Sequence, residues 1–565
     1  MAEPRALKGL TLLAVILAFL VPRLPALDRY VTTDEPKWMM RSANVYHALS
    51  DLSLKYTYQH EHPGVTVTWA GAAAFLRRYP RYTSTRTGQI ERAEKLLIFL
   101  RNHHIPVMDI LSTGRLYMVL FIAAAIILSF LISTRLLGLM IAFLGFIFIA
   151  FDPFFTALSR LLGVDGLMSA LMLLSLLAYL SYLFNGRKRG YLLLSGISAG
   201  LSWLTKTPAL FLITFIGLLT LINLVPKLQG RDRAERASTR MLIRQVWSVS
   251  APALGWLAIA CIIFVILWPA MWVDPLNTLK NIFFQTTRYA LEGHENLTFF
   301  NGRIYDIGDS AWNFYLISFL WRTTPPVLIG VGMALLALVF HNKLKIPSKT
   351  MNVMLYLGLY TLLFTTAMSL GEKKFDRYLL PAHLACDLIA AFGWVTLADI
   401  LTSRLAGRLS AGYLQLSKLI LFGTIIAVQL TGVLQTYPYY LNYYNPILGG
   451  SDKASMVMMV GWGEGLDLVA NYLNEQPSAE ELRGISWYGD GPLSYLFVGQ
   501  TVGMDVDMNL DFLKRADYVV LYINQIPRQL PNPEILGYFE QLTPDQVVKI
   551  DRLEYAWIYD MRKLK

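Results

Sequence analysis

Charged side chains stand next to several of the long apolar stretches of this sequence. Asp34 and Glu35 follow the first stretch, Arg115 lies inside the second, and Asp165 begins the fourth, with Arg160 shortly before it. Ionisable groups at membrane depth are costly, and by default they indicate a functional site. Acids mixed with bases suit a substrate that carries a phosphate. Arg and Lys can hold its oxygens while a carboxylate takes a proton from the attacking group.

Further charged groups occur in short motifs: His62 in QHEHPGV, Lys206 in WLTKTPALF and Arg377 in GEKKFDRYLLP. Each also has an ordinary interpretation. An acidic pair after a helix is often a solvated loop, a basic side chain at a span end can snorkel, and an Arg inside a span can satisfy a carbonyl or an acid. His60 and His62 have weak metal-ligand spacing without a third ligand, so no metal residue is assigned. The hypothesis of a site therefore depends on these groups lying on one side of the membrane.

Long apolar runs must position these groups. The chain has 565 residues, of which 55% are hydrophobic and 16% are charged, whereas a soluble domain carries about 25% charged residues. A bilayer core needs about 20 apolar residues per helix. That length predicts an all-α polytopic membrane protein with about eleven transmembrane helices. The predicted spans are 8–26, 107–131, 139–157, 164–184, 190–205, 207–225, 249–268, 325–341, 351–370, 378–400 and 416–436.

Basic residues set the predicted orientation of a multi-pass protein in the cell membrane. They gather in short loops that share one side if the spans alternate: Arg135, Arg187 to Arg189, Lys227 to Arg244, Lys343 to Lys349, Arg404 and Arg408. Short loops of this kind are cytoplasmic. The N-terminus is then cytoplasmic, and the long loops 27–106 and 269–324 are extracytoplasmic. Residues 65–76 are too short to span and are expected to lie at the interface with membrane lipids, with Trp69 near the headgroups.

Residues 437–565 differ from the rest in composition. They carry 10 basic and 17 acidic residues, a net charge of −7, so with +11 for the whole chain residues 1–436 carry +18. This layout argues against nucleic acid as a partner. Short buried strands are predicted in GISWYG, ADYVVLYI and YAWIYDM, and a helix in WGEGLDLVANYLNEQ. We therefore expect a transmembrane domain over 1–436 and a small extracytoplasmic α/β domain over 437–565.

The motifs resemble, in order, those of the GT-C glycosyltransferases, specifically the protein O-mannosyltransferase and aminoarabinose-transferase-like group (glycosyltransferase family 39 and relatives). Asp34-Glu35 resembles the acidic pair of the family's first outer loop. HPG at 62–64 resembles its HPP or KPP signature, with Gly64 in place of the second Pro. Arg115 in STGRLYMVL, and the segments SRLLGVDGLM, KTPALF and KKFDRYLLP, resemble its later motifs. The resemblance implies the GT-C fold for the membrane part.

The resemblance also implies an activity. GT-C members transfer a sugar from a polyprenyl or dolichyl phosphate to an acceptor, usually with inversion. Asp34 would be the base that deprotonates the acceptor hydroxyl. Glu35 would orient Asp34 or act as a second acid, and Asp165 would help to position the acceptor or a cation.

The remaining candidate residues are implied to bind the substrates. Arg115, Lys206 and Arg377 would stabilise the departing lipid phosphate, because preorganised cations lower the barrier to its departure. His62 and Arg160 would contact the donor or the acceptor. The acceptor, whether protein, lipid or glycan, is left open. No cofactor is assigned, and a divalent cation is left open as well.

Two other classes of protein fit part of this pattern. A membrane transporter or lipid flippase would have charged sites at mid-membrane and often repeat symmetry. The sequence shows no internal repeat, and the candidate charges lie near the outer ends of the spans. A substrate cavity crossing the whole bilayer would favour that class. A non-catalytic scaffold would be favoured by a fold without the pocket of Asp34 and Arg115.

Overall fold

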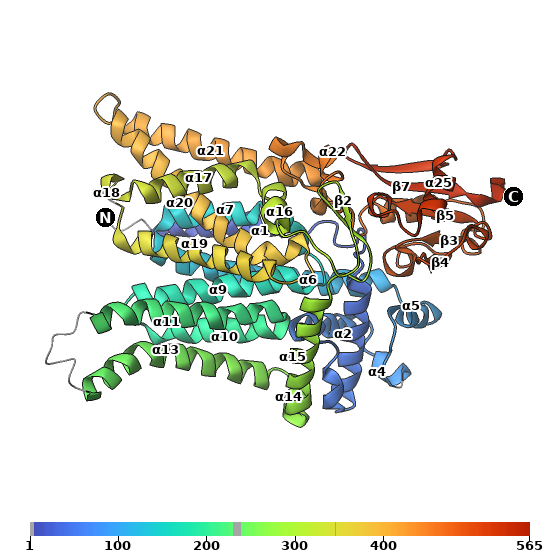
Figure 1. Cartoon of the computed structure of the whole chain (residues 1–565), viewed down its shortest axis with the longest axis horizontal. Coiled ribbons are helices and arrows are strands. Elements are labelled where there is room, and N and C mark those ends of the chain that lie inside the picture. The colour runs from blue at the N-terminus through green and yellow to red at the C-terminus, as the bar shows by residue number, and fades with distance from the viewer. Residues whose placement is uncertain (1–4, 87, 230–238, 345, 565) are drawn as a thin grey trace.

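The computed structural model describes residues 5–86, 88–229, 239–344 and 346–564. Long helices form a bundle at one end, and an α/β domain built from the C-terminal residues lies at the other end (Figure 1). Short helices lie across the junction between these two parts. Part of the predicted basic loop between Lys227 and Arg244, residues 230–238, lies outside the described residues.

Each predicted span corresponds to a helix of the bundle. Apolar side chains favour this arrangement in lipid, where a helix satisfies all of its own backbone polar groups. The helices are α1 (Arg5–Leu20), α6 (Val107–Leu137), α7 (Leu139–Ala150), α9 (Val164–Phe184), α10 (Arg189–Thr205), α11 (Phe211–Gln229), α13 (Thr239–Ile266), α17 (Pro325–Val339), α19 (Ser348–Ser369), α20 (Leu380–Leu405) and α21 (Ala411–Thr436).

The lengths of these helices differ from the prediction. Over the described residues, seven spans are long and apolar enough to cross a membrane. An eighth is added if α16 (Phe314–Arg322) and α17, which meet at a bend of 116°, form one span. The helices α1, α7, α10 and α17 have 16, 12, 17 and 15 residues. At about 1.5 Å per residue, each is shorter than a hydrocarbon core of about 30 Å.

The helix α7 is short because a polar break follows it. Asp152 caps the next helix, α8 (Pro153–Leu158), where its side chain accepts a hydrogen bond of 2.9 Å from the amide of Phe155. Arg23 is fully buried beside the break and donates to the carbonyl of Ala150 at 2.8 Å. Carbonyls at a helix end need such partners. The predicted span 139–157 is therefore two helices.

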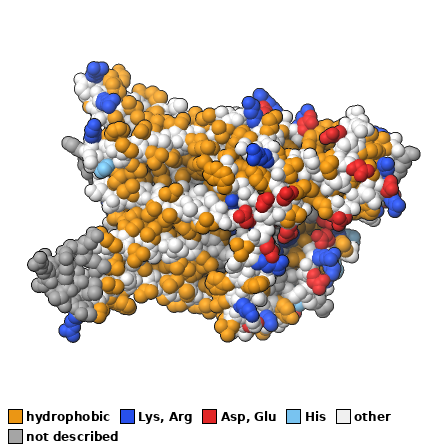
Figure 2. Space-filling view, in the orientation of Figure 1, with side chains coloured by type: hydrophobic (Ala, Val, Ile, Leu, Met, Phe, Trp, Pro, Cys, Tyr) orange, Lys and Arg blue, Asp and Glu red, His pale blue; other side chains and the backbone are white. Residues whose placement is uncertain are grey.

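Several short helices cross the end of the bundle. They are α2 (Glu35–Ser50), α3 (Val65–Arg78), α5 (Ala93–Asn102), α14 (Ala270–Val273) and α15 (Pro275–Glu292). The helix α3 covers the segment predicted to lie at the interface. It packs against α2 and α6 and buries most of its side chains, while Trp69 is 42% exposed. Hydrophobic side chains cover the visible face of the bundle, and the acidic ones gather toward the C-terminal domain (Figure 2).

The C-terminal domain contains a five-stranded mixed sheet in the order β4-β3-β5-β7-β6. The central strand β5 (Tyr518–Tyr522) is parallel to β3 (Arg483–Ser486) and antiparallel to β7 (Leu553–Asp560). The outer strands are β4 (Gln500–Gly503) and β6 (Gln546–Ile550).

Alternate side chains of β5 point to opposite faces of the sheet, as strand geometry requires. Tyr518, Val520 and Tyr522 pack with α23 (Leu466–Asn474), and Val519 and Leu521 pack with α25 (Pro533–Glu540). The two-sided burial explains the continuous apolar run of this strand. The predicted small α/β domain is present, with the three predicted strands as β3, β5 and β7.

Candidate active site

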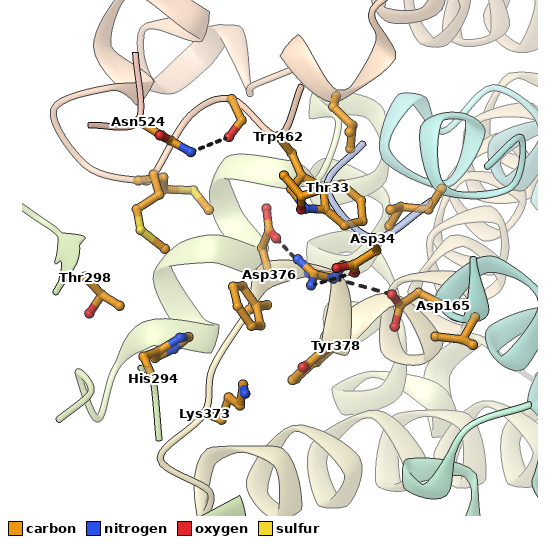
Figure 3. Close-up of a pocket in the computed structure, with 18 of the residues that line it drawn as sticks. Thr33, Asp34, Asp165, His294, Thr298, Lys373, Asp376, Tyr378, Trp462 and Asn524 are labelled. Carbon is orange, nitrogen blue, oxygen red and sulfur yellow. Dashed lines mark hydrogen bonds and ion pairs between the residues drawn. The ribbon is translucent and has the colours of Figure 1, made fainter. Parts of the chain in front are cut away.

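A cavity of about 470 Å³ lies between the end of the bundle, the junction helices and the C-terminal domain (Figure 3). Lys and Arg outnumber Asp and Glu along its lining by seven to five, which favours an anionic ligand. Its charged and aromatic lining includes Asp34, Lys37, Trp38, Arg41, His60, His62, Asp165, Lys206, His294, Glu295, Arg322, Lys373, Asp376, Arg377, Trp462, Glu464, Trp487, Tyr488 and Arg528.

Four of the predicted residues form one connected group of charges in this cavity. Arg377 lies between two carboxylates: its Nη2 is 3.4 Å from Oδ2 of Asp34, and its Nε is 3.4 Å from Oδ2 of Asp165. The Nζ of Lys206 donates to Oδ1 of Asp165 at 2.7 Å. Figure 3 shows Asp34 and Asp165 close together at one side of the cavity. Segments separated by up to 343 residues thus supply one site.

The side chain of Asp34 is free to face the cavity because it does not cap the helix that it precedes. It is the N-cap residue of α2, yet its side chain makes no capping hydrogen bond. An N-cap aspartate usually accepts from an amide in the first turn. Here the carboxylate points to Arg377 instead, and 40% of the side chain is exposed. Replacing this carboxylate should therefore cost little helix stability.

Aromatic rings hold the cations of the site. The guanidinium carbon of Arg377 lies 4.2 Å from the ring centroid of Phe375 and 4.3 Å from that of Trp462. The Nζ of Lys206 lies 3.9 Å from the centroid of Tyr378. Such contacts stabilise a desolvated cation. The Nε of Arg377 is buried and lies 3.4 Å from Oδ2 of Asp165 as an ion pair, without the geometry of a hydrogen bond.

His62 lines the cavity as an uncharged side chain. Its Nδ1 lies 3.0 Å from the hydroxyl of Thr207. Burial, reinforced by nearby cations, lowers the pKa of His62 well below its ordinary value and lowers that of His60 to about 3. Both imidazoles are therefore neutral at physiological pH. They can contact a ligand through hydrogen bonds, but they add no positive charge to hold a phosphate.

The structure explains why Gly64 stands where the motif of the resembling family has its second Pro. Its φ is +58°, and a Cβ at this position would lie 2.1 Å from the ring of Trp38. Proline is locked near a φ of about −65°. The loop that carries His62 therefore takes a conformation that proline cannot adopt, with its backbone against α2.

The placement of Arg115 corrects its predicted phosphate role, and Glu35 forms a buried pair with it behind Asp34. Neither residue lines the cavity. Arg115 donates to both carboxylate oxygens of Glu35, at 2.7 and 2.5 Å, and to the carbonyls of Leu27 and Tyr30 at 2.7 and 2.8 Å. Glu35 also accepts from the amide of Leu162 at 3.0 Å. These saturated, buried bonds leave the pair no reach to a phosphate or an acceptor, and they clamp the Asp34 loop to the bundle.

Arg160 was also predicted to contact substrate, and its position corrects that role. It is buried outside the cavity lining and donates to the carbonyls of Pro25 and Ala26. Its guanidinium carbon lies 5.2 Å from the ring centroid of Tyr440. Arg160 therefore ties the exit of α1 to the start of the C-terminal segment.

Several lining residues were not predicted. Lys37 and Arg41 lie three and seven positions after Asp34 on α2, which places all three on one helix face. That spacing was a usable signal. Arg322 donates to Asp376 at 2.7 Å and to the carbonyl of Leu441 at 2.7 Å, a pairing that no local pattern indicates.

The C-terminal domain meets the site through the segment GWGEG, residues 461–465, which we call the glycine loop. The amide of Gly463 donates to the hydroxyl of Tyr522 at 3.1 Å. A Cβ at Gly463 would lie 2.1 Å from the carbonyl oxygen of Val31. The glycine loop therefore packs directly on the backbone that leads into Asp34, and it holds Trp462 and Glu464 in the cavity wall.

We expect Gly463→Ala to loosen this junction. The φ of +124° is strained for any L side chain, and such strain costs about 1–3 kcal/mol before the clash is counted. The expected result is a lower unfolding temperature in detergent and faster proteolysis between bundle and domain. Gly537→Ala is the control, because nothing lies within 4 Å of its added Cβ. Equal behaviour of the two variants would contradict the proposed junction.

The described residues contain no group of three or more His, Cys, Asp or Glu side chains placed to hold a metal ion. His60 lies 3.3 Å from Glu61, and its ring centroid lies 5.7 Å from that of His62.

Comparisons with known proteins agree with this architecture. Residues 109–229 match the family model described as dolichyl-phosphate-mannose-protein mannosyltransferase. No curated protein matches the chain by sequence.

The chain is similar to ArnT from Cupriavidus metallidurans bound to undecaprenyl phosphate, with 12% identity, a TM-score of 0.50 and 98% of each chain covered. It is also similar to the oligosaccharyltransferase AglB from Archaeoglobus fulgidus, in complex with an inhibitory peptide and a dolichol-phosphate. There the identity is 13% and the TM-score 0.47, with 96% of this chain and 73% of that chain covered.

The class of protein follows from the fold and these matches. The chain is a polytopic membrane protein with the GT-C fold and a small C-terminal α/β domain. The GT-C fold that the sequence motifs predicted is confirmed, and the family match lies in the part of the bundle from α6 to α11.

Proposed function

We propose that this protein is a glycosyltransferase that moves a sugar from a polyprenyl or dolichyl phosphate to the hydroxyl of an acceptor. The observation that carries the proposal is Arg377, which lies 3.4 Å from both Asp34 and Asp165 inside a cavity rich in basic side chains. The site thereby joins an accessible carboxylate to a cation that can hold a phosphate. Both are needed when the bond between the sugar and the phosphate oxygen is replaced by a bond between the sugar and the acceptor oxygen.

The proposed reaction is a single displacement. The acceptor oxygen attacks the anomeric carbon and loses its proton to Asp34, while the bond from that carbon to the phosphate oxygen breaks. The electron pair of the broken bond leaves with the lipid phosphate, and the new bond forms on the opposite face, so the configuration inverts. Positive charge on the sugar and negative charge on the phosphate develop together, and Arg377 and Lys206 stabilise the latter.

Asp165 has a supporting role in this proposal. It pairs with Lys206 at 2.7 Å and contacts Arg377 at 3.4 Å, so it holds both cations in one geometry. Preorganised charges need no rearrangement during the reaction, which is the main source of their effect. The acceptor class and the sugar class are left to experiment.

The proposed orientation places the cavity and the C-terminal domain on the extracytoplasmic side. The basic short loops at the other end of the bundle support this, because such loops stay cytoplasmic. The donor lipid would then reach the cavity from the outer leaflet, at the level of the junction helices.

The direct test uses purified protein with a panel of polyprenyl-phosphate sugars, a mixture of peptide, lipid and glycan acceptors, and mass spectrometry. We expect one donor to be consumed and free polyprenyl phosphate to appear in equal amount with a glycosylated acceptor. A donor that is only moved between leaflets of a vesicle, chemically unchanged, would instead support a flippase.

We expect Arg377→Gln to lower kcat by about 10²–10³, the usual cost of removing one preorganised charge-stabilising group. The phosphate would lose the cation that lies between the two carboxylates. Arg404→Gln, an exposed position at the other end of α20, is the matched control and should keep normal turnover. If the Arg377 variant folds and transfers sugar at the rate of the control, Arg377 does not act on the leaving group.

A further inference from the structure

The cavity has two chemically different walls. Lys37, Arg41, His62, Lys206 and Lys373 gather on the side of α2 and the bundle. The opposite wall comes from the C-terminal domain and presents Trp462, Glu464, Trp487, Tyr488, Asn524 and one basic residue, Arg528, whose guanidinium donates to the carbonyl and the side-chain oxygen of Asn524. Figure 3 shows Trp462 beside Thr33 and Asp34, away from His294 and Lys373. A basic wall suits a phosphate, whereas rings with a carboxylate and an amide suit an uncharged ligand rich in hydroxyl groups.

Glu464 is the unusual group in this second wall. It is 1% exposed, and no ion pair among the described residues includes it. Its Oε2 accepts from the amide of Trp462 at 2.5 Å and lies 3.5 Å from the hydroxyl of Tyr522. That hydroxyl donates to the carbonyl of Glu464 at 2.8 Å, so it gives little to the carboxylate.

A buried carboxylate with so few donors has unused capacity. Its two oxygens offer about four acceptor positions, and buried polar atoms are normally satisfied. Burial raises the pKa of Glu464, and hydrogen bonds from the backbone and from Tyr522 oppose that rise only in part. Because Glu464 lines the cavity, a ligand bound there can supply the missing donors.

The position of Trp462 shows which part of a ligand would lie here. Its ring centroid is 4.3 Å from the guanidinium carbon of Arg377, which the proposed function assigns to the phosphate. The donor sugar is joined to that phosphate by a single oxygen, so it must lie directly next to Arg377. The glycine loop, which carries both Trp462 and Glu464, is the neighbouring wall.

We propose that Trp462 and Glu464 of the glycine loop form the donor-sugar subsite, in which Glu464 accepts hydrogen bonds from hydroxyl groups of the sugar ring. The C-terminal domain then determines which sugar is used, while the bundle handles the phosphate. This inference rests on the proposed function, since it takes the ligand to be a lipid-phosphate-linked sugar.

The test compares the binding of undecaprenyl phosphate with that of undecaprenyl phosphates carrying a hexose or one of its monodeoxy derivatives. The protein should bind the hexosyl lipid more tightly than the bare lipid phosphate. Glu464→Gln should lose about ten- to a hundredfold in affinity for the hexosyl lipid, as expected for bonds to a charged acceptor. Its affinity for undecaprenyl phosphate should not change. Glu534→Gln, exposed on α25 of the same domain, is the matched control.

A second arm compares monodeoxy donors in the unchanged protein and in the Glu464→Gln variant. In the unchanged protein, at least one monodeoxy donor should bind more weakly, and Glu464→Gln should be insensitive to that same deletion. Equal weakening of all lipids by Glu464→Gln, or unchanged binding of the hexosyl lipid, would overturn the subsite. So would equal affinity of the unchanged protein for every deoxy donor. Failure to bind undecaprenyl phosphate in any form would instead count against the proposed function itself.

Discussion

Asp34→Asn should reduce sugar transfer by about 10²–10⁴ while leaving the protein folded. The magnitude is that of losing a positioned general base. Asparagine has nearly the same shape but cannot take the proton of the acceptor hydroxyl. The fold should tolerate the change, because the side chain of Asp34 makes no capping hydrogen bond and its ion pair within the described residues is a 3.4 Å contact with Arg377.

The measurement is the initial rate of transfer from the donor identified by mass spectrometry, with the unfolding temperature measured in parallel. Asp109→Asn is the matched control, since Asp109 is exposed in the first turn of α6 and lies outside the cavity lining. Transfer by a folded Asp34→Asn protein at the control rate would remove Asp34 from the mechanism. Lost activity together with a lowered unfolding temperature would point to a structural role instead.

Arg115→Met should destabilise the protein by about 3–5 kcal/mol, the cost of leaving a buried partner charge unpaired. Arg115 and Glu35 are 3% and 1% exposed, and the pair also organises the loop between α1 and α2. Removing the arginine leaves the buried Glu35 carboxylate unpaired and takes a hydrogen-bond donor from the carbonyls of Leu27 and Tyr30. The expected result is a large fall in unfolding temperature, with loss of activity as a consequence of the displaced Asp34.

A double variant separates this role from direct catalysis. Glu35→Gln with Arg115→Met removes both charges while keeping an acceptor oxygen near Leu162, so it should be less destabilised than the sum of the two single changes. Arg135→Met, exposed at the other end of α6, is the control for the arginine. If Arg115→Met kept a normal unfolding temperature and lost only transfer, the originally predicted phosphate role would be restored.

The C-terminal domain contributes side chains to a site whose charged groups come from the rest of the chain. The bundle alone supplies Asp34, Asp165, Lys206 and Arg377, but one face of Arg377 is covered by Trp462 from the glycine loop. The C-terminal domain therefore forms part of the cavity wall. Its side chains shield the charged groups from water, and electrostatic interactions are stronger where water is excluded.

Much of the architecture was readable from one-dimensional patterns. Apolar runs predicted where the bundle helices lie, although only seven or eight spans of the described residues, and not about eleven, are long and apolar enough to cross a membrane. The change of composition after residue 436 predicted the α/β domain. Both signals are local, because helix length and strand alternation depend only on neighbouring residues. The same reasoning overestimated several spans, since a run of apolar residues does not reveal where Asp152 will cap a new helix or where α16 and α17 will bend.

The partners of the charged residues were decided by the packed structure alone. Asp34 and Glu35 are neighbours in the chain, yet one points into the cavity and the other is buried against Arg115, 80 residues away. Arg377 meets Asp34 across 343 residues, and Trp462 arrives from a separate domain. The sequence shows which charged residues exist and predicts their depth in the membrane from the apolar runs around them. Only the packing of distant helices sets the few ångströms that separate a paired structural charge from one that faces a ligand.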